Sequence, residues 1–246
     1  MDFKDKIVFI TGSSRGIGAQ MIYDFAKYGA NVVINYNNSY DEALKLKTKV
    51  EREFSSNVLL VKGDISNEND VLKMVSYIIC EFGKIDILVN NAGICCDSLF
   101  DDKTKDNFIK ILEVNLIGTY LVSREVVKFM NDGSKIINIS SDNAFNGYPE
   151  SLDYDSSKAG IISLTHNMAQ VYSPKINVNC VCPGWVNTDM NKDLDAEQVS
   201  KLQEKILLGR FASKEEISSV VLFLASDKAS YVNDSIITVN GGVKNV

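Results

Sequence analysis

The sequence of 246 residues is poor in the residues that mark unusual protein classes. It has only three prolines, and 24% of its residues are charged, which excludes fibrous and intrinsically disordered chains. Its one histidine is His166, so neither a Ser-His-Asp triad nor a metal-binding spacing is present. We expect His166 to be a packed or surface residue rather than a catalytic base, and we expect no metal ion.

Cysteine is also used sparingly. The five cysteines are an odd number and lack the CxxC spacing, which argues against both a disulfide framework and a zinc site. Cys180 and Cys182 stand two apart in a strand-like segment, so they share a face, and we expect buried, reduced thiols. The Cys95-Cys96 pair follows a motif described below and is placed to line a pocket.

An excess of positive charge and a long hydrophobic run are missing as well. The formal net charge is −6, so a broad basic surface for nucleic acid or anionic membrane is absent. No apolar run approaches the roughly 20 residues of a membrane span. The chain enters a strand-like segment directly after Met1–Lys6, without the apolar core of a signal peptide. These features favour a cytoplasmic protein with no nucleic-acid or membrane partner.

Short apolar segments alternate with longer segments of helical period along the whole chain. The apolar segments are rich in Val and Ile, as strands buried on both faces of a sheet are. We expect strands at Ile7–Thr11, Asn31–Tyr36, Val58–Lys62, Ile87–Asn90, Lys135–Ser140, Asn177–Cys182 and Ile236–Val239. We expect helices at Gly16–Tyr28, Tyr40–Phe54, Glu68–Phe82, Lys105–Met130, Asp155–Tyr172 and Lys214–Ala225.

This alternation implies right-handed crossovers between parallel strands. The predicted fold class is α/β: a Rossmann fold with a doubly wound, parallel, seven-stranded sheet and helices on both faces. No repeat or linker interrupts the pattern, so residues 1–246 are expected to form a single domain. One long segment, about 184–210, lies outside the pattern and has a helix candidate around Glu197–Leu207. Its length is typical of a lid or binding loop.

A glycine-rich turn, Thr11–Gly18, joins the first strand to the first helix. Gly12, Gly16 and Gly18 permit a tight turn and a close approach of the backbone to a pyrophosphate. The start of the helix then supplies free N–H groups and a partial positive charge. Its place between strand and helix predicts dinucleotide binding.

Tyr154 and Lys158 stand four residues apart and therefore on one helix face. The spacing alone is not specific, because Tyr23 and Lys27 repeat it on the first helix. Ser141 distinguishes the two copies: it lies thirteen residues before Tyr154, just after the fifth strand, at the sheet edge where ligands bind.

Three further strings complete the pattern. Asn90-Asn91-Ala92-Gly93 ends the fourth strand, and Pro183-Gly184, followed by Thr188, ends the sixth. Asn115 lies inside a predicted helix, where asparagine is mildly unfavourable and therefore invites a polar explanation.

Together these motifs resemble the short-chain dehydrogenase/reductase family over essentially all 246 residues, in order and at family spacing. The resemblance implies a catalytic tetrad of Asn115, Ser141, Tyr154 and Lys158. Tyr154 would deliver a proton to the substrate oxygen, Ser141 would hydrogen-bond that oxygen, and Lys158 would hold the nicotinamide ribose. Asn115 would anchor a water that links Lys158 to solvent. We also expect Lys158 and the nicotinamide ring to lower the pKa of the Tyr154 phenol.

The same resemblance, together with the glycine turn, assigns a set of residues to the cofactor. These are Gly12, Ser14, Arg15, Gly16, Ile17, Gly18, Asn35, Asp64, Ile65, Asn91, Ala92, Gly93, Tyr154, Lys158, Pro183, Gly184 and Thr188. An NAD site usually has an acid at the end of the second strand, but here Asn35 begins a run with no acid until Asp41. Arg15 is placed to bind a 2′-phosphate, so the sequence favours NADP, used as NADPH.

Within the family, the chain looks most like the 3-oxoacyl-(acyl carrier protein) reductases, which act as homotetramers in fatty-acid synthesis. The supporting segments include Thr188–Met190, Gly209–Phe211 and Val239–Gly242. The implied substrate is a 3-oxoacyl thioester, which acyl carrier protein would carry as the partner. Cys95-Cys96-Asp97 and the polar Asp142, Asn143 and Asn146 depart from that subgroup.

These departures keep two alternatives open. One is a related dehydrogenase acting on a sugar, polyol, steroid or other small alcohol or ketone. The other is a cofactor-binding regulator without catalysis, which a broken tetrad would mark, whereas all four residues are present here.

Overall fold

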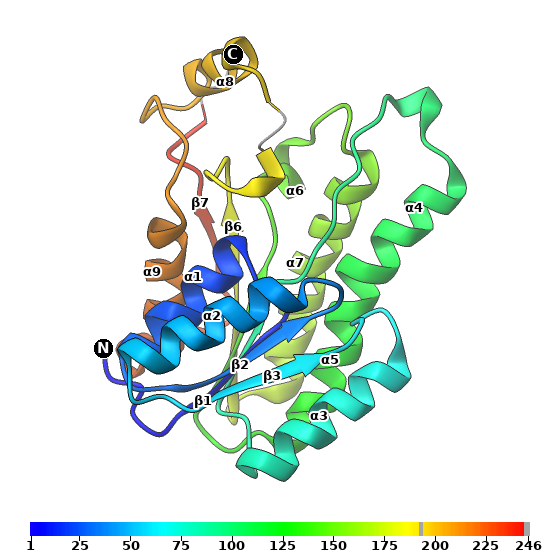
Figure 1. The fold of residues 1–246 in the computed structure, drawn as a ribbon. Helices are drawn as coiled ribbons and strands as arrows, with labels where there is room; N and C mark the ends of the chain where they lie inside the picture. The colour runs from blue at the N-terminus through cyan, green and yellow to red at the C-terminus, as the bar shows by residue number, and fades with distance from the viewer. Residues whose placement is uncertain (192–193, 244–246) are drawn as a thin grey trace.

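A computed structural model describes residues 1–191 and 194–243. Seven strands form one parallel sheet in the order β3-β2-β1-β4-β5-β6-β7, flanked by helices on both faces (Figure 1). This confirms the predicted fold class. The strands are β1 Ile7–Ile10, β2 Asn31–Tyr36, β3 Val58–Lys62, β4 Ile87–Asn90, β5 Ser134–Ile139, β6 Ile176–Pro183 and β7 Ile236–Val239.

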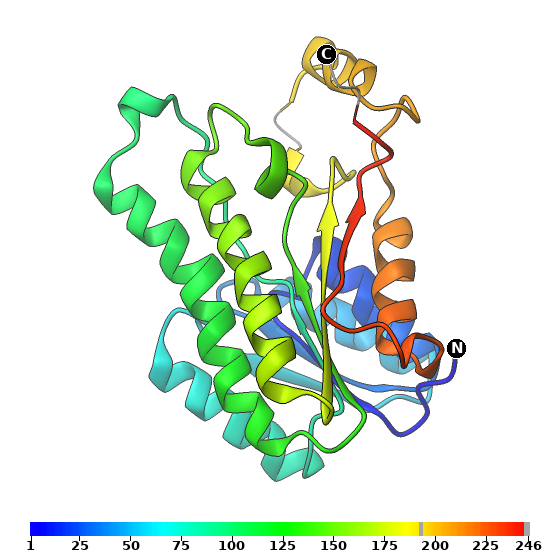
Figure 2. The same cartoon turned by 180° about the vertical axis from the view of Figure 1, so that it is seen from behind.

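The sheet is covered on both faces, and apolar residues that alternate along its strands face two separate core clusters. In β1, Val8 and Ile10 belong to one core cluster, while Ile7 and Phe9 belong to the other, as successive side chains of a strand point to opposite faces. The first face is covered by α1 Gly16–Lys27, α2 Tyr40–Glu53 and α9 Lys214–Ala225. The opposite face is covered by α3 Glu68–Phe82, α5 Gly118–Val126 and α7 Leu152–Tyr172, and α4 Lys105–Leu112 packs against α7 (Figure 2).

The helix predicted over Lys105–Met130 is not continuous. A π-helical turn at Glu113–Ile117 separates α4 from α5, and a 3₁₀ turn follows at Val127–Phe129. Within the π turn, the carbonyl of Asn115 accepts a hydrogen bond from the Thr119 hydroxyl at 2.7 Å. Such turns are frequent at functional sites. Hydrophobic periodicity does not reveal the turn, because the apolar face continues through it.

The other boundaries equal the predicted ones or differ from them by a few residues. α7 begins at Leu152 rather than Asp155, so Tyr154 lies in its first turn. The helix expected at Glu197–Leu207 is α8, Ala196–Glu204, and Asp195 caps it through a capping box with Gln198. A short helix, α6 Asn143–Asn146, precedes α7. Among the described helices, none combines the length and apolarity that a membrane crossing needs.

The strand order places a crevice between β1 and β4. The chain runs outward from β1 to β3 on one side and from β4 to β7 on the other, so β1 and β4 pair directly. In such sheets, ligands bind outside the carboxyl ends of the strands at this reversal of order. The glycine turn after β1 and the Asn91–Gly93 segment after β4 both open there.

A buried polar chain joins this edge of the sheet to α7. The Asn90 amide donates to the Asn138 oxygen at 2.8 Å, and the Asn138 amide donates to the Thr165 hydroxyl at 2.9 Å. Asn138 and Thr165 are fully buried. These hydrogen bonds therefore hold α7, which carries Tyr154 and Lys158, against β4 and β5.

We predict that Asn138→Ala lowers the free energy of unfolding by roughly 1–3 kcal/mol, because it leaves buried partners unpaired. Urea denaturation of the purified protein measures this difference. Asn167→Ala, which removes an exposed amide that donates to Ser163, is the matched control and should change stability by less than about 0.5 kcal/mol. Equal stabilities of Asn138→Ala and wild type would contradict the prediction.

Candidate active site

The glycine-rich turn has the backbone conformation that its glycines allow. Gly12 and Gly16 have φ angles of +59° and +61°, which side chains disfavour. A Cβ on Gly12 would lie 2.8 Å from the Ala92 Cα, so the turn after β1 packs directly on the segment after β4. A Cβ on Gly16 would have no atom within 4 Å, so this part of the turn faces open space.

Polar side chains beneath the turn hold it in place. The Asn35 side-chain oxygen accepts from the Gly12 N–H at 2.9 Å, and its amide donates to the carbonyls of Val61 and Gly63. Asn35 is 2% exposed, so its side chain supports the turn from below. This differs from the predicted direct contact of Asn35 with the cofactor, because the β2 pleat points that side chain inward. On the other side, the Asn91 amide donates to the carbonyls of Thr11 and Gly12.

The other predicted cofactor residues surround the crevice. Arg15 is exposed and precedes α1, while Ser14 and Ile17 are partly buried around it. The Asp64 carboxylate, just past β3, accepts from the Ser66 N–H and hydroxyl and from the Asn37 amide. Ile65 is buried and packs closely on Gly118. A Cβ placed on Gly118 would lie only 2.8 Å from the Ile65 Cδ1 atom.

Lys158 is buried beneath the carboxyl end of β5. It is 2% exposed, and its ammonium donates to the Ile139 carbonyl at 2.9 Å. Burial lowers its pKa to about 8, because a low-dielectric surrounding disfavours the charged form. Its Nζ lies 5.4 Å from the Tyr154 ring centroid. A Cβ on Gly93 would lie 3.4 Å from the same Nζ, so the segment after β4 borders the ammonium.

Tyr154 stands beside Ser141, whose hydroxyl is near enough to the phenol to affect its pKa. Burial raises the pKa of the Tyr154 phenol above its usual value, the nearby Cys95 thiol raises it further, and the Ser141 hydroxyl opposes this. The expected lowering of this pKa by Lys158 together with the nicotinamide ring stays a prediction. In the protein by itself, burial dominates the pKa of the phenol, and the Lys158 ammonium donates to the Ile139 carbonyl.

Asn115 connects the segment after β4 to α7. Its oxygen accepts from the Ile94 N–H at 2.8 Å, and its amide donates to the Ile94 carbonyl at 2.9 Å and to the Ser157 hydroxyl at 3.0 Å. Asn115 is completely buried. The structure therefore brings all four members of the predicted tetrad, namely Asn115, Ser141, Tyr154 and Lys158, to one end of the sheet.

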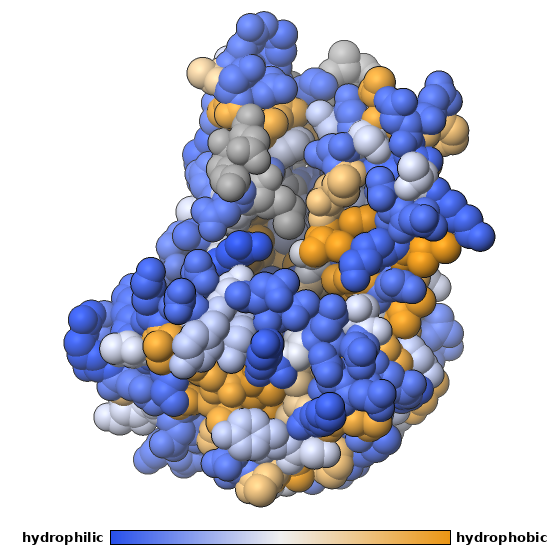
Figure 3. Space-filling view, turned by 45° about the vertical axis from the view of Figure 1, so that its right-hand side comes forward, coloured by the Kyte–Doolittle hydropathy of each residue, from blue (hydrophilic) through white to orange (hydrophobic). Residues whose placement is uncertain are grey.

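Pro183, Gly184 and Thr188 form the opposite wall of the crevice. The Gly184 N–H donates to the Val239 carbonyl at 3.0 Å, which ties this segment to β7. Thr188 lines a cavity together with Gly16, from the glycine turn. The surface is hollowed between two projections at this end of the molecule (Figure 3). The open space at Gly16 and the buried ammonium of Lys158 fit a dinucleotide along the crevice.

The sequence interpretation missed a polar group beside Tyr154. The Asp97 carboxylate accepts from the Ser151 hydroxyl at 2.6 Å and from the Cys95 thiol at 3.0 Å. Desolvation, together with Asp97, raises the pKa of Cys95 to about 12, so this thiol is not a ready nucleophile. In the sequence, the one indication of this polar group was that Asp97 directly follows Cys95-Cys96.

A buried ion pair anchors the same loop to α7. Lys103 Nζ lies 3.0 Å from Asp153 Oδ1, and the two side chains are 2% and 0% exposed. Lys103 also donates to the Cys96 carbonyl at 2.5 Å. Asp153 directly precedes Tyr154, so the pair connects the loop that carries Cys95 to the residue before the tyrosine. No local pattern reveals such a pair, because its members are distant in sequence.

The remaining cysteines and the histidine lie where the sequence suggested. Cys180 and Cys182 are buried free thiols on one face of β6, with their sulfurs 3.9 Å apart. His166 is a surface residue whose Nδ1 lies 2.6 Å from Asp234, outside the tetrad. Asp234 has a φ of +56°, as the turn before β7 requires.

We predict that Lys103→Met lowers the free energy of unfolding by roughly 3–5 kcal/mol, since it leaves the Asp153 carboxylate buried without its cation. The double variant Lys103→Met/Asp153→Leu should recover most of this loss. Urea denaturation measures both. Lys105→Met, which removes a neighbouring exposed lysine, is the control and should match wild type. A double variant less stable than Lys103→Met would refute the assignment.

Known proteins resemble this chain over nearly its whole length. Residues 12–244 match the family described as enoyl-(acyl carrier protein) reductase. The chain is 37% identical over 241 residues to the 3-oxoacyl-[acyl-carrier-protein] reductase of Aquifex aeolicus, covering 97% of each protein. A short-chain dehydrogenase/reductase from Serratia marcescens superimposes with a TM-score of 0.94 at 33% identity, covering 98% of this chain and 99% of that one.

A short-chain dehydrogenase from Burkholderia cenocepacia, solved in complex with NADP, superimposes with a TM-score of 0.93 at 28% identity. That match covers 98% of this chain and 99% of the other. Sequence similarity, sheet order and the clustered Ser141, Tyr154 and Lys158 thus agree, and the family they indicate uses NAD(P). The chain belongs to the short-chain dehydrogenase/reductase family and is an oxidoreductase.

Proposed function

We propose that the chain is an NADPH-dependent reductase that converts 3-oxoacyl thioesters to the 3-hydroxyacyl form. The observation that carries this proposal is the 37% identity with a 3-oxoacyl-[acyl-carrier-protein] reductase over 97% of both proteins. A substrate delivered on acyl carrier protein, a homotetramer and a cytoplasmic location, as in related enzymes, are part of the same proposal.

The cofactor site in this proposal follows the crevice between β1 and β4. The N–H groups at the start of α1, from Gly16 to Gly18, would hold the diphosphate, because a helix N-terminus favours anions. The Lys158 ammonium has N–H groups beyond the one bonded to Ile139 and would hold the nicotinamide ribose. When bound, NADPH supplies the hydride.

Tyr154 is the proton donor in this proposal. Burial raises the pKa of its phenol, so the group stays protonated at neutral pH, as a donor must be. Ser141, which stands beside the same phenol, would bond the substrate oxygen and stabilise the charge that develops there. After proton transfer, the Lys158 ammonium would stabilise the phenolate.

Asn115 acts as a positioning residue in this proposal. Its side chain holds Ile94 on one side and Ser157 of α7 on the other, so it fixes the distance between the loop after β4 and the helix of Tyr154. The water that links Lys158 to solvent would be held at the π turn, which contains Asn115.

NADP rather than NAD is favoured by charge. Arg15 is exposed at the start of α1 and forms a planar, charged partner for a 2′-phosphate. The end of β2 carries no acid, and the amide of Asn37 is held by Asp64 beside it. An acid at that position would repel a 2′-phosphate.

The acyl chain would lie under the segment 184–210, which we propose as the lid. Trp185 stacks on Phe211 with ring centroids 5.6 Å apart, and Leu202 and Ile206 pack against this pair. Beside this cluster, Leu207 and Leu208 are exposed, and they support a substrate with a hydrocarbon chain because their apolar surface can be shielded from water on binding.

A second candidate is a dehydrogenase of small polyhydroxylated alcohols or ketones. The polar group of Asp97, Ser151 and Cys95 beside Tyr154 favours it, since a carboxylate at that place accepts hydrogen bonds from substrate hydroxyls. The same rate assays separate the two candidates.

We predict that the protein oxidises NADPH with acetoacetyl-coenzyme A and that Tyr154→Phe lowers kcat by about 10²–10⁴, the usual contribution of an acid catalyst. Initial rates followed at the NADPH absorbance measure this, with NADH in parallel. Tyr23→Phe, the other tyrosine four residues before a lysine, is the control and should retain the wild-type rate. No turnover with acetoacetyl-coenzyme A, combined with turnover of a sugar or polyol, would replace the first candidate by the second.

The reduction rate should also depend on the charge of Lys158. Its folded-state pKa of about 8 means that it is cationic below that pH and neutral above it. We predict that kcat/KM for reduction is level from pH 6 to 7 and falls about tenfold per unit above pH 8. A profile measured from pH 6 to 10 tests this, and a level profile up to pH 9.5 would show that the ammonium is not required.

A further inference from the structure

The cavity at the glycine turn is lined by a cation that the proposed mechanism does not use. Its volume is about 290 Å³, and its lining includes Gly16 at the start of α1, Thr188 after β6 and Lys214 at the start of α9. We propose that Lys214 binds the diphosphate of the dinucleotide, which rests on the proposed use of NADPH. Lys214 would then be a cofactor-binding residue supplied by the far end of the chain.

Lys214 occupies a position where a cation does not stabilise the fold. It is the first residue of α9, whose N-terminus is capped by Ser213 and Glu216. The partial positive charge of a helix N-terminus opposes a lysine there. Among the described residues, Lys214 has neither an ion pair nor a side-chain hydrogen bond, whereas Arg210 nearby is bonded to Glu216 through two nitrogens. Its ammonium is therefore available to a ligand.

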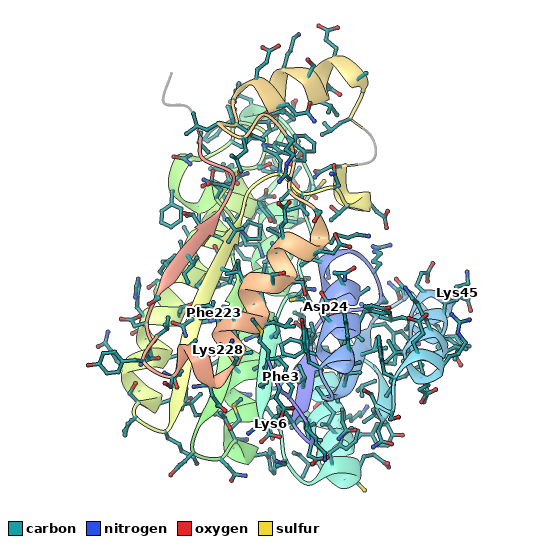
Figure 4. All side chains as sticks on the ribbon, turned by 90° about the vertical axis from the view of Figure 1, so that its left-hand side faces the viewer. Phe3, Lys6, Asp24, Lys45, Phe223 and Lys228 are labelled. Carbon is teal, nitrogen blue, oxygen red and sulfur yellow. The ribbon has the colours of Figure 1, made fainter. Side chains whose placement is uncertain are left out.

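The packing of α9 on α1 brings this ammonium to the glycine turn. The Ser218 hydroxyl, one turn into α9, donates to the Asp24 carboxylate of α1 at 2.6 Å. Figure 4 shows the two helices side by side, with Asp24 between them. Both helices begin at the carboxyl edge of the sheet, so Lys214 and the free N–H groups of α1 border the same space.

The charges around the cavity explain why a lysine is needed there. Asp189 also lines the cavity, and its carboxylate would repel an anion bound at Gly16. Lys214 is the one basic side chain among the lining residues within the described part of the chain. It therefore offsets Asp189 and adds a charged hydrogen bond to the diphosphate.

The site of Lys214 differs from that of Arg15 in a way that binding can test. A 2′-phosphate is present only in NADPH, whereas the diphosphate is common to NADPH and NADH. Lys214→Met should weaken the binding of both dinucleotides equally, by about five- to twentyfold, which is the effect of one charge-assisted hydrogen bond. Arg15→Ala should weaken NADPH binding and leave NADH binding unchanged.

Titration calorimetry of the free protein with NADPH and with NADH measures these constants without turnover. Lys214→Arg retains the charge and should stay within about threefold of wild type. Lys105→Met is the matched control, since Lys105 is also the first residue of a helix and does not line this cavity. The thermal midpoint of unliganded Lys214→Met should equal or exceed that of wild type, because the substitution removes a cation from a helix N-terminus.

Weaker binding of NADPH alone would assign Lys214 to the 2′-phosphate and overturn the proposal, as would unchanged binding of both dinucleotides. A lower thermal midpoint of Lys214→Met without rescue by Lys214→Arg would indicate a structural role and also overturn it. A wild-type protein that binds neither dinucleotide would refute the proposed function as well. Dinucleotide binding without thioester reduction would refute only the proposed substrate.

Discussion

Parallel pairing of β1 with β4 is the constraint on which the site depends. Because every strand of the sheet runs in the same direction, the turn after β1 and the segment after β4 leave the sheet at one edge, and they do so as neighbours. The close approach of Gly12 to Ala92 and the bonds from the Asn91 amide to Thr11 and Gly12 then join them. A crevice results whose floor is backbone and whose walls come from segments far apart in sequence.

The surroundings at this edge of the sheet shift the pKa values of Tyr154 and Lys158. Both groups are buried, and burial favours the neutral form of each: it raises the pKa of the phenol and lowers that of the ammonium to about 8. A protonated phenol suits the delivery of a proton to a carbonyl, and a buried ammonium suits the stabilisation of the phenolate left behind. Both directions agree with the proposed reduction near neutral pH.

Much of the fold and of the site could be predicted from local sequence. The Val- and Ile-rich segments gave four strands with the boundaries that the structure has, including Asn31–Tyr36 and Ile236–Val239. Motif spacing identified Ser141, Tyr154 and Lys158, which the fold brings together. Prediction was less complete where the backbone departs from a regular period. The π turn at Glu113–Ile117 leaves the apolar pattern intact, so a single helix was expected over Lys105–Met130.

By itself, the sequence determined the order of strands and helices along the chain and the place of the glycine turn, because these depend on local periodicity and on spacing within one segment. The tetrad was predicted from the resemblance of several motifs to a known family. Only the tertiary structure decided that Asn35 supports the turn from below, that Lys103 pairs with Asp153 beside Tyr154, and that Lys214 borders the cavity of Gly16. Each of these joins residues from distant segments. Contacts of that kind are set by how helices pack on the sheet, and no local pattern in the chain encodes them.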